Sequence, residues 1–472
     1  MKKSIIKLAS LLTAIAMMVP MAGCGERVVE ESVWVGDKAN TQTITHSSGS
    51  SGTTGTDSDA VNVSDRTTNV TDVPNDGNSY DLKGATVTIA GWGDYGAEVA
   101  PSASYYADWV KMVSEIEKKY NCKLEFKAGD DSLAYNNSWV TAAQSGVKFA
   151  DIVTLASSWP FPSQIKAGYL HPLDNYLNLK DPVFNTSAVD SLAVDGKHYL
   201  TVMINRVYVG SGLVFNKDIL KKFGAQTPHD YIKANNWNFD TFLELAQKCT
   251  GKKDGVQYYG VDSAGIATFA EANGGHMVSN QNGKYTFTGH TDEKYLKGAQ
   301  FALDLVYKYK VQGGDFEKGT AAMGFIAQYN TGKLDSALGS NWGWAYIPKG
   351  WDVSDYQIEV TETTSYGIPS TVKNPDVIAK IMYDFFYPYK WRESFEDQAE
   401  NQFPDATSLQ IYLDMGYRGL ENTNLSPLYT YISREVGWTG LAQCLKDNTA
   451  PQVYLSSIAS KAQAELDAIW EQ

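Results

Sequence analysis

The chain has 472 residues and a formal net charge of −14 at pH 7, with 54 acidic and 40 basic residues. This acidic balance argues against nucleic acid and anionic lipid headgroups as partners, since both repel a negatively charged surface. The length allows two lobes of ordinary domain size. The six histidines are scattered, and no cysteine and histidine residues have the spacing of a zinc site, so we expect no metal and no cofactor.

Residues 1–23 have the layout of a secretory signal peptide. Three lysines precede an apolar run, residues 8–19, that is well short of the roughly 20 residues of a membrane-spanning helix. Met21-Ala22-Gly23-Cys24 resembles a bacterial lipobox, which implies cleavage before Cys24 and lipid attachment to this cysteine. Because the cleaved segment holds three lysines and no acidic residue, the mature chain has a net charge of −17.

Residues 24–79 are predicted to form a flexible polar tether that begins at the lipidated cysteine. From Asn40 to Ser79 the chain is rich in Ser, Thr, Gly, Asp and Asn and contains no aromatic residue. Such a segment buries too little apolar surface to offset the entropy lost on ordering. The folded body is therefore expected to begin at Tyr80.

The first part of this body alternates strands with a helix. Thr86–Ala90 has the alternation of a strand, Lys123–Phe126 is a second strand, and Asp151–Leu155 is a third, buried on both faces. Between the first two, Ala103–Tyr120 has apolar residues at helical spacing: Tyr106, Trp109, Val110, Val113, Ile116 and Tyr120. This order predicts a parallel α/β sheet.

Later segments continue the α/β pattern. Asn238 is expected to cap a helix whose buried face holds Phe242, Leu245, Ala246 and Cys249. Asn374-Pro375-Asp376 predicts a helix start, and Val453–Trp470 is an amphipathic helix. The three cysteines of the body, Cys122, Cys249 and Cys444, are too few for a disulfide framework. One bridge with a free thiol is possible, but three small buried side chains are favoured.

A series of short motifs, in order and at characteristic spacing over residues 84–390, resembles the extracellular solute-binding proteins of ABC importers that include maltose- and oligosaccharide-binding proteins. The motifs are Ala143–Gly146, Phe149–Val153, Gly168–Leu170, Pro172–Asp174, Asp195–Lys197, Leu213–Lys217, Trp237–Asp240, Asn273–Gly275, Ala321–Met323, Ile347–Gly350, Tyr366–Pro369 and Asn374-Pro375. No single motif is specific, because short words of Gly, Pro and Asn occur by chance.

The resemblance implies a two-lobe α/β fold of the periplasmic-binding-protein-like type II, with a hinge and a ligand cleft between the lobes. The first lobe would comprise residues 80–203 and about 355–403, and the second residues 204–354 and about 404–472. The chain would cross between lobes near Met203–Val209, Trp351–Tyr356 and Asn401–Thr407. Ligand contacts to both lobes would favour the closed state.

A sugar ring needs an aromatic platform and planar polar groups that pair with hydroxyls, and in α/β lobes these follow strand ends. Trp92 and Tyr95 occupy a glycine-rich loop after the first strand, with packing against the lobe as the alternative. Asp131 ends the second strand. It is either an acid that binds ligand hydroxyls or an ordinary turn residue. Trp159 follows the third strand, and a contact with ligand and packing against the lobe are equally favoured alternatives for it.

The remaining candidates lie in the first crossing and the second lobe. Arg206 and Tyr208 belong to the crossing, where an arginine often forms a structural ion pair instead. Asn273 would bring backbone to the rim of the cleft. Gln328 and Tyr329 stand where relatives offer an aromatic platform, usually a tryptophan. Trp342 and Trp344 alternate on one strand: we expect Trp344 in the core and retain Trp342 as a candidate contact.

The resemblance implies a lipid-anchored substrate-binding component of an ABC importer, a monomer that captures a carbohydrate and delivers it to the membrane permease. A neutral oligosaccharide is favoured because the candidate loops are rich in rings and not basic. A peptide or polyamine ligand is the alternative, and a surface glycoside hydrolase or an adhesin is a more distant one. The chain has no serine elbow, metal motif or P-loop, so no enzyme activity is expected. The expected location is the outer face of the cytoplasmic membrane in a Gram-positive type of envelope.

Overall fold

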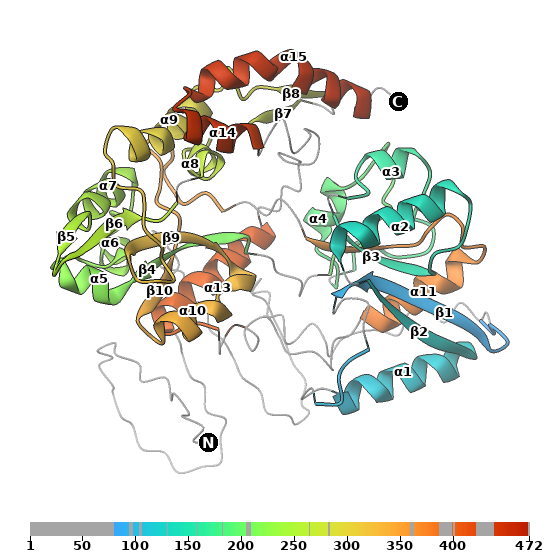
Figure 1. The fold of residues 1–472 in the computed structure, drawn as a ribbon. Helices are drawn as coiled ribbons and strands as arrows, with labels where there is room; N and C mark the ends of the chain where they lie inside the picture. The colour runs from blue at the N-terminus through green and yellow to red at the C-terminus, as the bar shows by residue number, and fades with distance from the viewer. Residues whose placement is uncertain are drawn as a thin grey trace, which may run out of the picture.

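Two separate sheets organise the chain in the computed structural model, each at the centre of one lobe (Figure 1). The structure describes residues 80–93, 98–102, 106–129, 131–157, 159–181, 183–203, 209–263, 265–281, 284–358, 363–386, 399, 402–421 and 439–470. The predicted signal peptide, the tether and Cys24 lie outside these residues, as do Tyr95, Arg206 and Tyr208.

The first lobe contains a four-stranded sheet in the order β11-β3-β1-β2. The strands β1 (Ala85–Trp92), β2 (Cys122–Gly129) and β3 (Ile152–Ala156) are parallel, and β11 (Thr364–Gly367) runs antiparallel to β3. The three strands predicted from the sequence are confirmed, and so is their parallel arrangement. All five residues of β3 are buried because helices cover both faces of this sheet.

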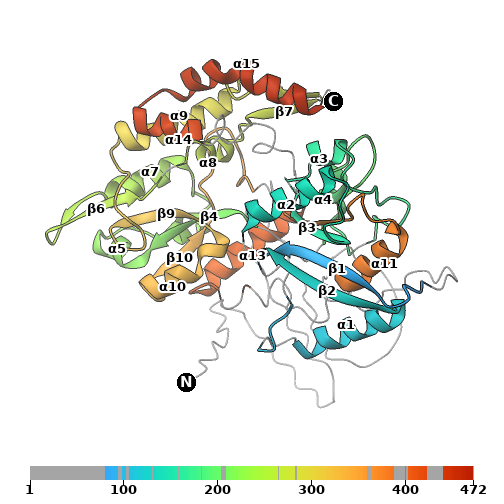
Figure 2. The ribbon, with the colours of Figure 1, turned by 45° about the vertical axis from the view of Figure 1, so that its right-hand side comes forward.

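Helices pack on both faces of the first sheet (Figures 1 and 2). They are α1 (Tyr106–Tyr120), α2 (Ser132–Gln144), α3 (Ser163–Lys166), α4 (Thr186–Ser191) and α11 (Pro375–Phe386). The predicted first helix is confirmed from Tyr106, and Trp109, Ile116 and Tyr120 are buried as expected. Val110 is a correction: it is 41% exposed and so lies outside the buried face of α1.

The second lobe contains a five-stranded sheet in the order β10-β4-β9-β6-β5. These strands are β4 (Ser211–Asn216), β5 (Gly251–Lys253), β6 (Val256–Val261), β9 (Ala321–Ala327) and β10 (Trp342–Ala345). β6 and β9 are parallel, and the other neighbours are antiparallel. The carboxyl ends of β6 and β9 therefore lie at one edge of the sheet.

The helices of the second lobe surround this sheet and continue into a C-terminal layer (Figure 1). They are α5 (Lys217–Lys222), α6 (Pro228–Lys233), α7 (Phe239–Lys248), α8 (Ile266–Ala272), α9 (Glu293–Tyr307), the short 3-10 helix η3 (Gln328–Asn330), α10 (Gly332–Leu338), α13 (Ala406–Glu421), α14 (Gly440–Asp447) and α15 (Pro451–Trp470). A hairpin of β7 (Val278–Gln281) and β8 (Lys284–Phe287) packs against α15. The predicted C-terminal helix is confirmed.

Local sequence signals set several helix boundaries. The Asn238 side chain accepts hydrogen bonds from the backbone N–H groups of Asp240 and Thr241, at 3.0 and 3.1 Å, and so begins α7 as predicted. The expected inner face of α7 is buried, and Cys249 ends the helix at 0% exposure. Among the described residues Cys122, Cys249 and Cys444 are all buried and unpaired, which confirms the favoured alternative.

The chain passes between the two sheets three times. It leaves the first lobe after Met203 to enter β4, returns between β10 and β11, and crosses again between α11 and α13. We call these the first, second and third crossings. Helix α13 lies where the lobes meet and contacts both β10 and α4 (Figure 2).

Candidate functional site

An aromatic cluster lies at the carboxyl ends of the strands of the first lobe. The Trp92 ring is 4.7 Å from the Trp159 ring and 6.1 Å from the Tyr135 ring, measured between centroids. Trp92 ends β1, and Trp159 follows β3, so parallel pairing brings two residues far apart in sequence to one sheet edge. Both tryptophans are half-buried and thus keep part of each ring accessible. This cluster can offer an apolar platform.

Tyr135 fixes the base of this aromatic cluster. Its hydroxyl donates to the carbonyl oxygen of Ala90 at 2.9 Å, and only 4% of the residue is exposed. Burial raises the pKa of the Tyr135 phenol, so it stays neutral at physiological pH. Gly129 allows this close approach, since a Cβ there would lie 2.9 Å from the Tyr135 Cβ. Sequence reasoning did not single out Tyr135, although an aromatic residue just after a strand end was a usable signal.

Asp131 is exposed at the same sheet edge and begins α2. Its Oδ1 accepts a hydrogen bond from the Ala134 backbone N–H at 2.9 Å, so the residue is an N-cap. Asp131 thus has the local structural role that the sequence offered as one alternative. A contact between its carboxylate and a ligand stays a prediction.

Gln328 marks the corresponding edge of the second lobe. It begins η3 directly after β9, is half-buried, and its Nε2 donates to the Gln402 Oε1 at 2.6 Å. Its backbone N–H donates to the Gly210 carbonyl at 3.1 Å. The side chain of Tyr329 lies outside the described residues, so its role stays a prediction.

Asp262 is a candidate that sequence reasoning missed. It follows β6 directly, and its Oδ2 lies 2.8 Å from where a Cβ on Gly324 of β9 would stand. Burial raises the pKa of this carboxyl, while a hydrogen bond from the Ser263 hydroxyl at 2.9 Å lowers it. An acid just after a predicted strand was the available signal. A half-buried acid at this edge can accept hydrogen bonds from ligand hydroxyls.

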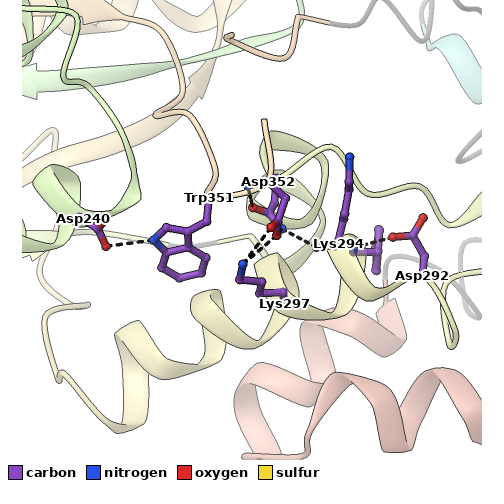
Figure 3. Close-up of polar contacts among 8 residues, drawn as sticks. Asp240, Asp292, Lys294, Lys297, Trp351 and Asp352 are labelled. Atoms are coloured by element: carbon purple, nitrogen blue, oxygen red, sulfur yellow. Dashed lines mark hydrogen bonds and ion pairs between the residues drawn. The ribbon is translucent and has the colours of Figure 1, made fainter. Parts of the chain in front are cut away.

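Asn273 lies in a structural network, not at an accessible surface. The residue is 0% exposed, and its Nδ2 donates to the Lys294 carbonyl and to the Asp352 Oδ2, both at 2.8 Å. Its Oδ1 accepts from the Asp352 backbone N–H at 3.2 Å. The Lys297 Nζ also pairs with Asp352, at 3.0 Å from Oδ1 and 2.9 Å from Oδ2 (Figure 3). These bonds fix the start of the second crossing against α9, and we withdraw Asn273 from the candidate site.

Trp342 is also withdrawn from the candidate site. It is 0% exposed, and its indole N–H donates to the Asp335 Oδ1 at 2.9 Å. Trp344 is likewise 0% exposed, in agreement with the core position expected for it. Asp335 of α10, Phe403 and helix α13 cover the face of β10 that holds both tryptophans, which explains why Trp342 is inaccessible.

The described residues contain no group of three or more Cys, His, Asp or Glu side chains arranged to hold a metal ion. None of the described helices combines the length and the apolar composition needed to cross a membrane.

Comparison with known proteins gives a family and a set of structural relatives. The family model for bacterial extracellular solute-binding proteins matches residues 100–410. A search of the curated proteins found no match. Three solved structures each cover 81–82% of this chain and 98–99% of their own.

These structures share the fold at low sequence identity. An ABC substrate-binding protein from Listeria monocytogenes, in complex with cycloalternan, has a TM-score of 0.57 at 17% identity. The cyclic α-maltosyl-1,6-maltose binding protein from Arthrobacter globiformis has a TM-score of 0.59 at 15% identity. UgpB from Mycobacterium tuberculosis, in complex with glycerophosphocholine, has a TM-score of 0.58 at 15% identity. The chain has the two-lobe α/β fold of these binding proteins, which are not enzymes. It belongs to the family of bacterial extracellular solute-binding proteins.

Proposed function

We propose that this protein is the carbohydrate-binding component of an ABC importer, with an oligosaccharide bound between its two lobes. The observation that carries the proposal is the aromatic cluster of Trp92, Tyr135 and Trp159 at the strand ends of the first lobe. The rings would stack on the apolar face of a sugar, while Asp131 and, from the second lobe, Asp262 and Gln328 would pair with its hydroxyls. Structural relatives solved with cycloalternan, mannotriose and maltotriose bound support this ligand class.

A second ligand class has support from one relative. UgpB, solved with glycerophosphocholine, is as similar in fold as the sugar-binding relatives. A thermal-shift panel separates these classes, because a bound ligand stabilises the native state by RT ln(1 + [L]/Kd). We expect maltotriose, mannotriose or a cyclic oligosaccharide to raise the melting temperature and glycerophosphocholine, a peptide and spermidine to leave it unchanged. A shift with one of the last three and none with any sugar would reject the carbohydrate proposal.

We further propose that lipid on Cys24 tethers the monomeric receptor to the outer face of the cytoplasmic membrane, where it delivers its ligand to the permease. The lipobox-like sequence before Cys24 and the extracellular family support this location. In a Gram-positive host, Cys24→Ala should release the protein into the medium, while Cys122→Ala should leave it in the membrane fraction. Retention of Cys24→Ala in the membrane would contradict the anchor.

A further inference from the structure

Gln328 is the point where two of the three crossings meet the edge of the second sheet. Its backbone N–H bonds to Gly210, which ends the first crossing, and its side chain bonds to Gln402, in the third crossing. The Gln328 carbonyl in turn accepts from the N–H and the hydroxyl of Thr331, at 3.0 and 2.9 Å. Backbone and side chain of this candidate ligand residue are thus fixed from three directions.

The segment around Gln402 is itself firmly attached to the second lobe. Phe403 packs on Trp342, at a ring distance of 6.1 Å, and on Trp344, at 5.6 Å. Asp405 forms an ion pair with Lys217 at 2.7 Å. A bond from Gln402 therefore holds the Gln328 amide against a rigid support.

We propose that Gln402 is a positioning residue for the second-lobe half of the ligand site. Its Oε1 holds the Gln328 Nε2, and among the described residues neither the Gln328 Oε1 nor the Gln402 Nε2 has a hydrogen-bond partner. The bonded pair therefore offers one acceptor and one donor in a fixed arrangement. A hydroxyl both donates and accepts, so this pair selects hydroxyl-rich ligands. The same bond joins the ligand site to the third crossing.

The test measures how this side-chain bond restrains the backbone around Gln328, by amide hydrogen exchange in the full chain without ligand. Gln402→Ala should speed exchange of the Gln328 and Thr331 amides by about fivefold, the scale of one lost hydrogen bond. In the double variant Gln328→Ala with Gln402→Ala, the Thr331 amide should exchange no faster than in Gln328→Ala alone. Gln402→Glu keeps an acceptor for the Gln328 Nε2, so exchange of the Gln328 and Thr331 amides should be slow again, as in the unchanged chain. Gln443→Ala is the matched control, since Gln443 also makes one side-chain bond, to Asp447 at 2.8 Å, on α14.

Unchanged exchange at Gln328 and Thr331 in Gln402→Ala would overturn the proposal, and so would equal exchange in Gln402→Glu and Gln402→Ala. A second measurement rests on the proposed function: titration with maltotriose and mannotriose. Gln402→Ala should weaken binding of whichever sugar binds the unchanged chain about fivefold or more, and Gln443→Ala should not. If neither sugar nor any other oligosaccharide binds the unchanged chain, the carbohydrate proposal fails, while hydrogen exchange still decides the role of Gln402.

Discussion

At the scale of single residues, Trp92 is the most direct probe of the ligand site. It ends β1, is half-buried, and its ring lies 4.7 Å from the Trp159 ring. Trp92→Ala should cost at least about 1 kcal/mol of binding free energy, the scale of one aromatic contact, with little loss of melting temperature. Calorimetric titration with the sugar found in the panel measures this. Trp351→Ala, which removes another partly exposed tryptophan, is the control for affinity; equal affinity of both variants would exclude Trp92 from the site.

The partly buried carboxylate of Asp262 should lower the free energy of unfolding at neutral pH. Burial raises its pKa above that of the unfolded chain, so the folded protein binds more protons between the two pKa values. Stability then falls as pH rises through that range. Asp262→Asn should therefore raise the free energy of unfolding at pH 7 by on the order of 1 kcal/mol, as is common when a functional group is removed. The gain should vanish once the pH lies below the carboxyl pKa of the unfolded chain.

Urea unfolding at pH 3.5 and pH 7 gives the free energies of unfolding to compare for Asp262→Asn and the unchanged chain. The same variant should bind the sugar identified by thermal shift more weakly. Asp81→Asn is a control at an exposed acid whose pKa is lowered by hydrogen bonds from the Lys83 backbone N–H and the Asn121 side chain; there the change at pH 7 should be a loss of stability. A gain for Asp262→Asn that is equal at both pH values would show that its charge is not the cause.

Residue roles could be predicted from the sequence only where the decisive neighbour is local. Trp92 ends β1 and Trp159 follows β3, so the strand pattern alone predicted that both lie at one edge of the sheet. Asn273 and Trp342 have partners at positions 352 and 335, and no local pattern shows that an amide or an indole N–H is already satisfied. Gln402 escaped notice for the same reason, since its partner is 74 residues away.

At the scale of elements, α13 ties the second crossing to the second lobe. Arg418 on α13 forms ion pairs with Asp414 at 2.8 Å and with Asp355 of the second crossing at 2.9 Å. Tyr346 donates to Asp414 and stacks on Tyr356 at a ring distance of 4.2 Å. Burial raises the pKa of Asp414 although Tyr346 and Arg418 lower it, so its charge depends on these two partners.

Arg418→Ala should destabilise the protein by roughly 3 kcal/mol at pH 7, because it leaves the buried Asp414 carboxylate without its cation. The loss should shrink toward acid pH, where Asp414 is protonated with or without Arg418 and the folded and unfolded chains bind equal numbers of protons. Denaturant unfolding from pH 4 to pH 7 measures both effects. Lys461→Ala removes the exposed pair with Glu465 on α15 and should change stability by at most about 0.5 kcal/mol. A loss for Arg418→Ala that does not depend on pH would point to packing instead.

The elements themselves could be predicted well because their signals repeat along the chain. Strand β3 is a short apolar run, and helix α7 has a capping residue followed by apolar residues at helical spacing. In both cases the signal lies within a few residues of the element. The helical period alone did not give the limits of a buried face: Val110 fits the spacing of α1 but is 41% exposed, and the buried residues of α1 are Trp109, Ile116 and Tyr120. The pairing of β11 with β3 was not predicted, because it joins residues such as Ser365 and Leu155 that are 210 positions apart and no local pattern indicates it.

At the scale of the whole molecule, the free thiols report on each lobe separately. Cys122 begins β2 in the first lobe, while Cys249 and Cys444 lie in the second. Burial raises the pKa of all three thiols, to about 12 for Cys249 and about 11 for Cys444. Thiolate is the reactive form, so a thiol reagent should reach them only when the surrounding lobe opens.

A ligand that contacts both lobes must therefore protect all three cysteines together. In the full chain carrying Cys24→Ser, we expect a saturating panel sugar to slow labelling of Cys122, Cys249 and Cys444 alike, by a factor that approaches 1 + [L]/Kd where labelling requires unfolding. Peptide mass spectrometry after timed exposure to iodoacetamide resolves the three rates. The same sugar with Trp92→Ala should protect each of them less, to equal degrees. Protection of Cys249 and Cys444 without Cys122 would mean that the ligand binds the second lobe alone, and the aromatic cluster of the first lobe would then have no part in binding.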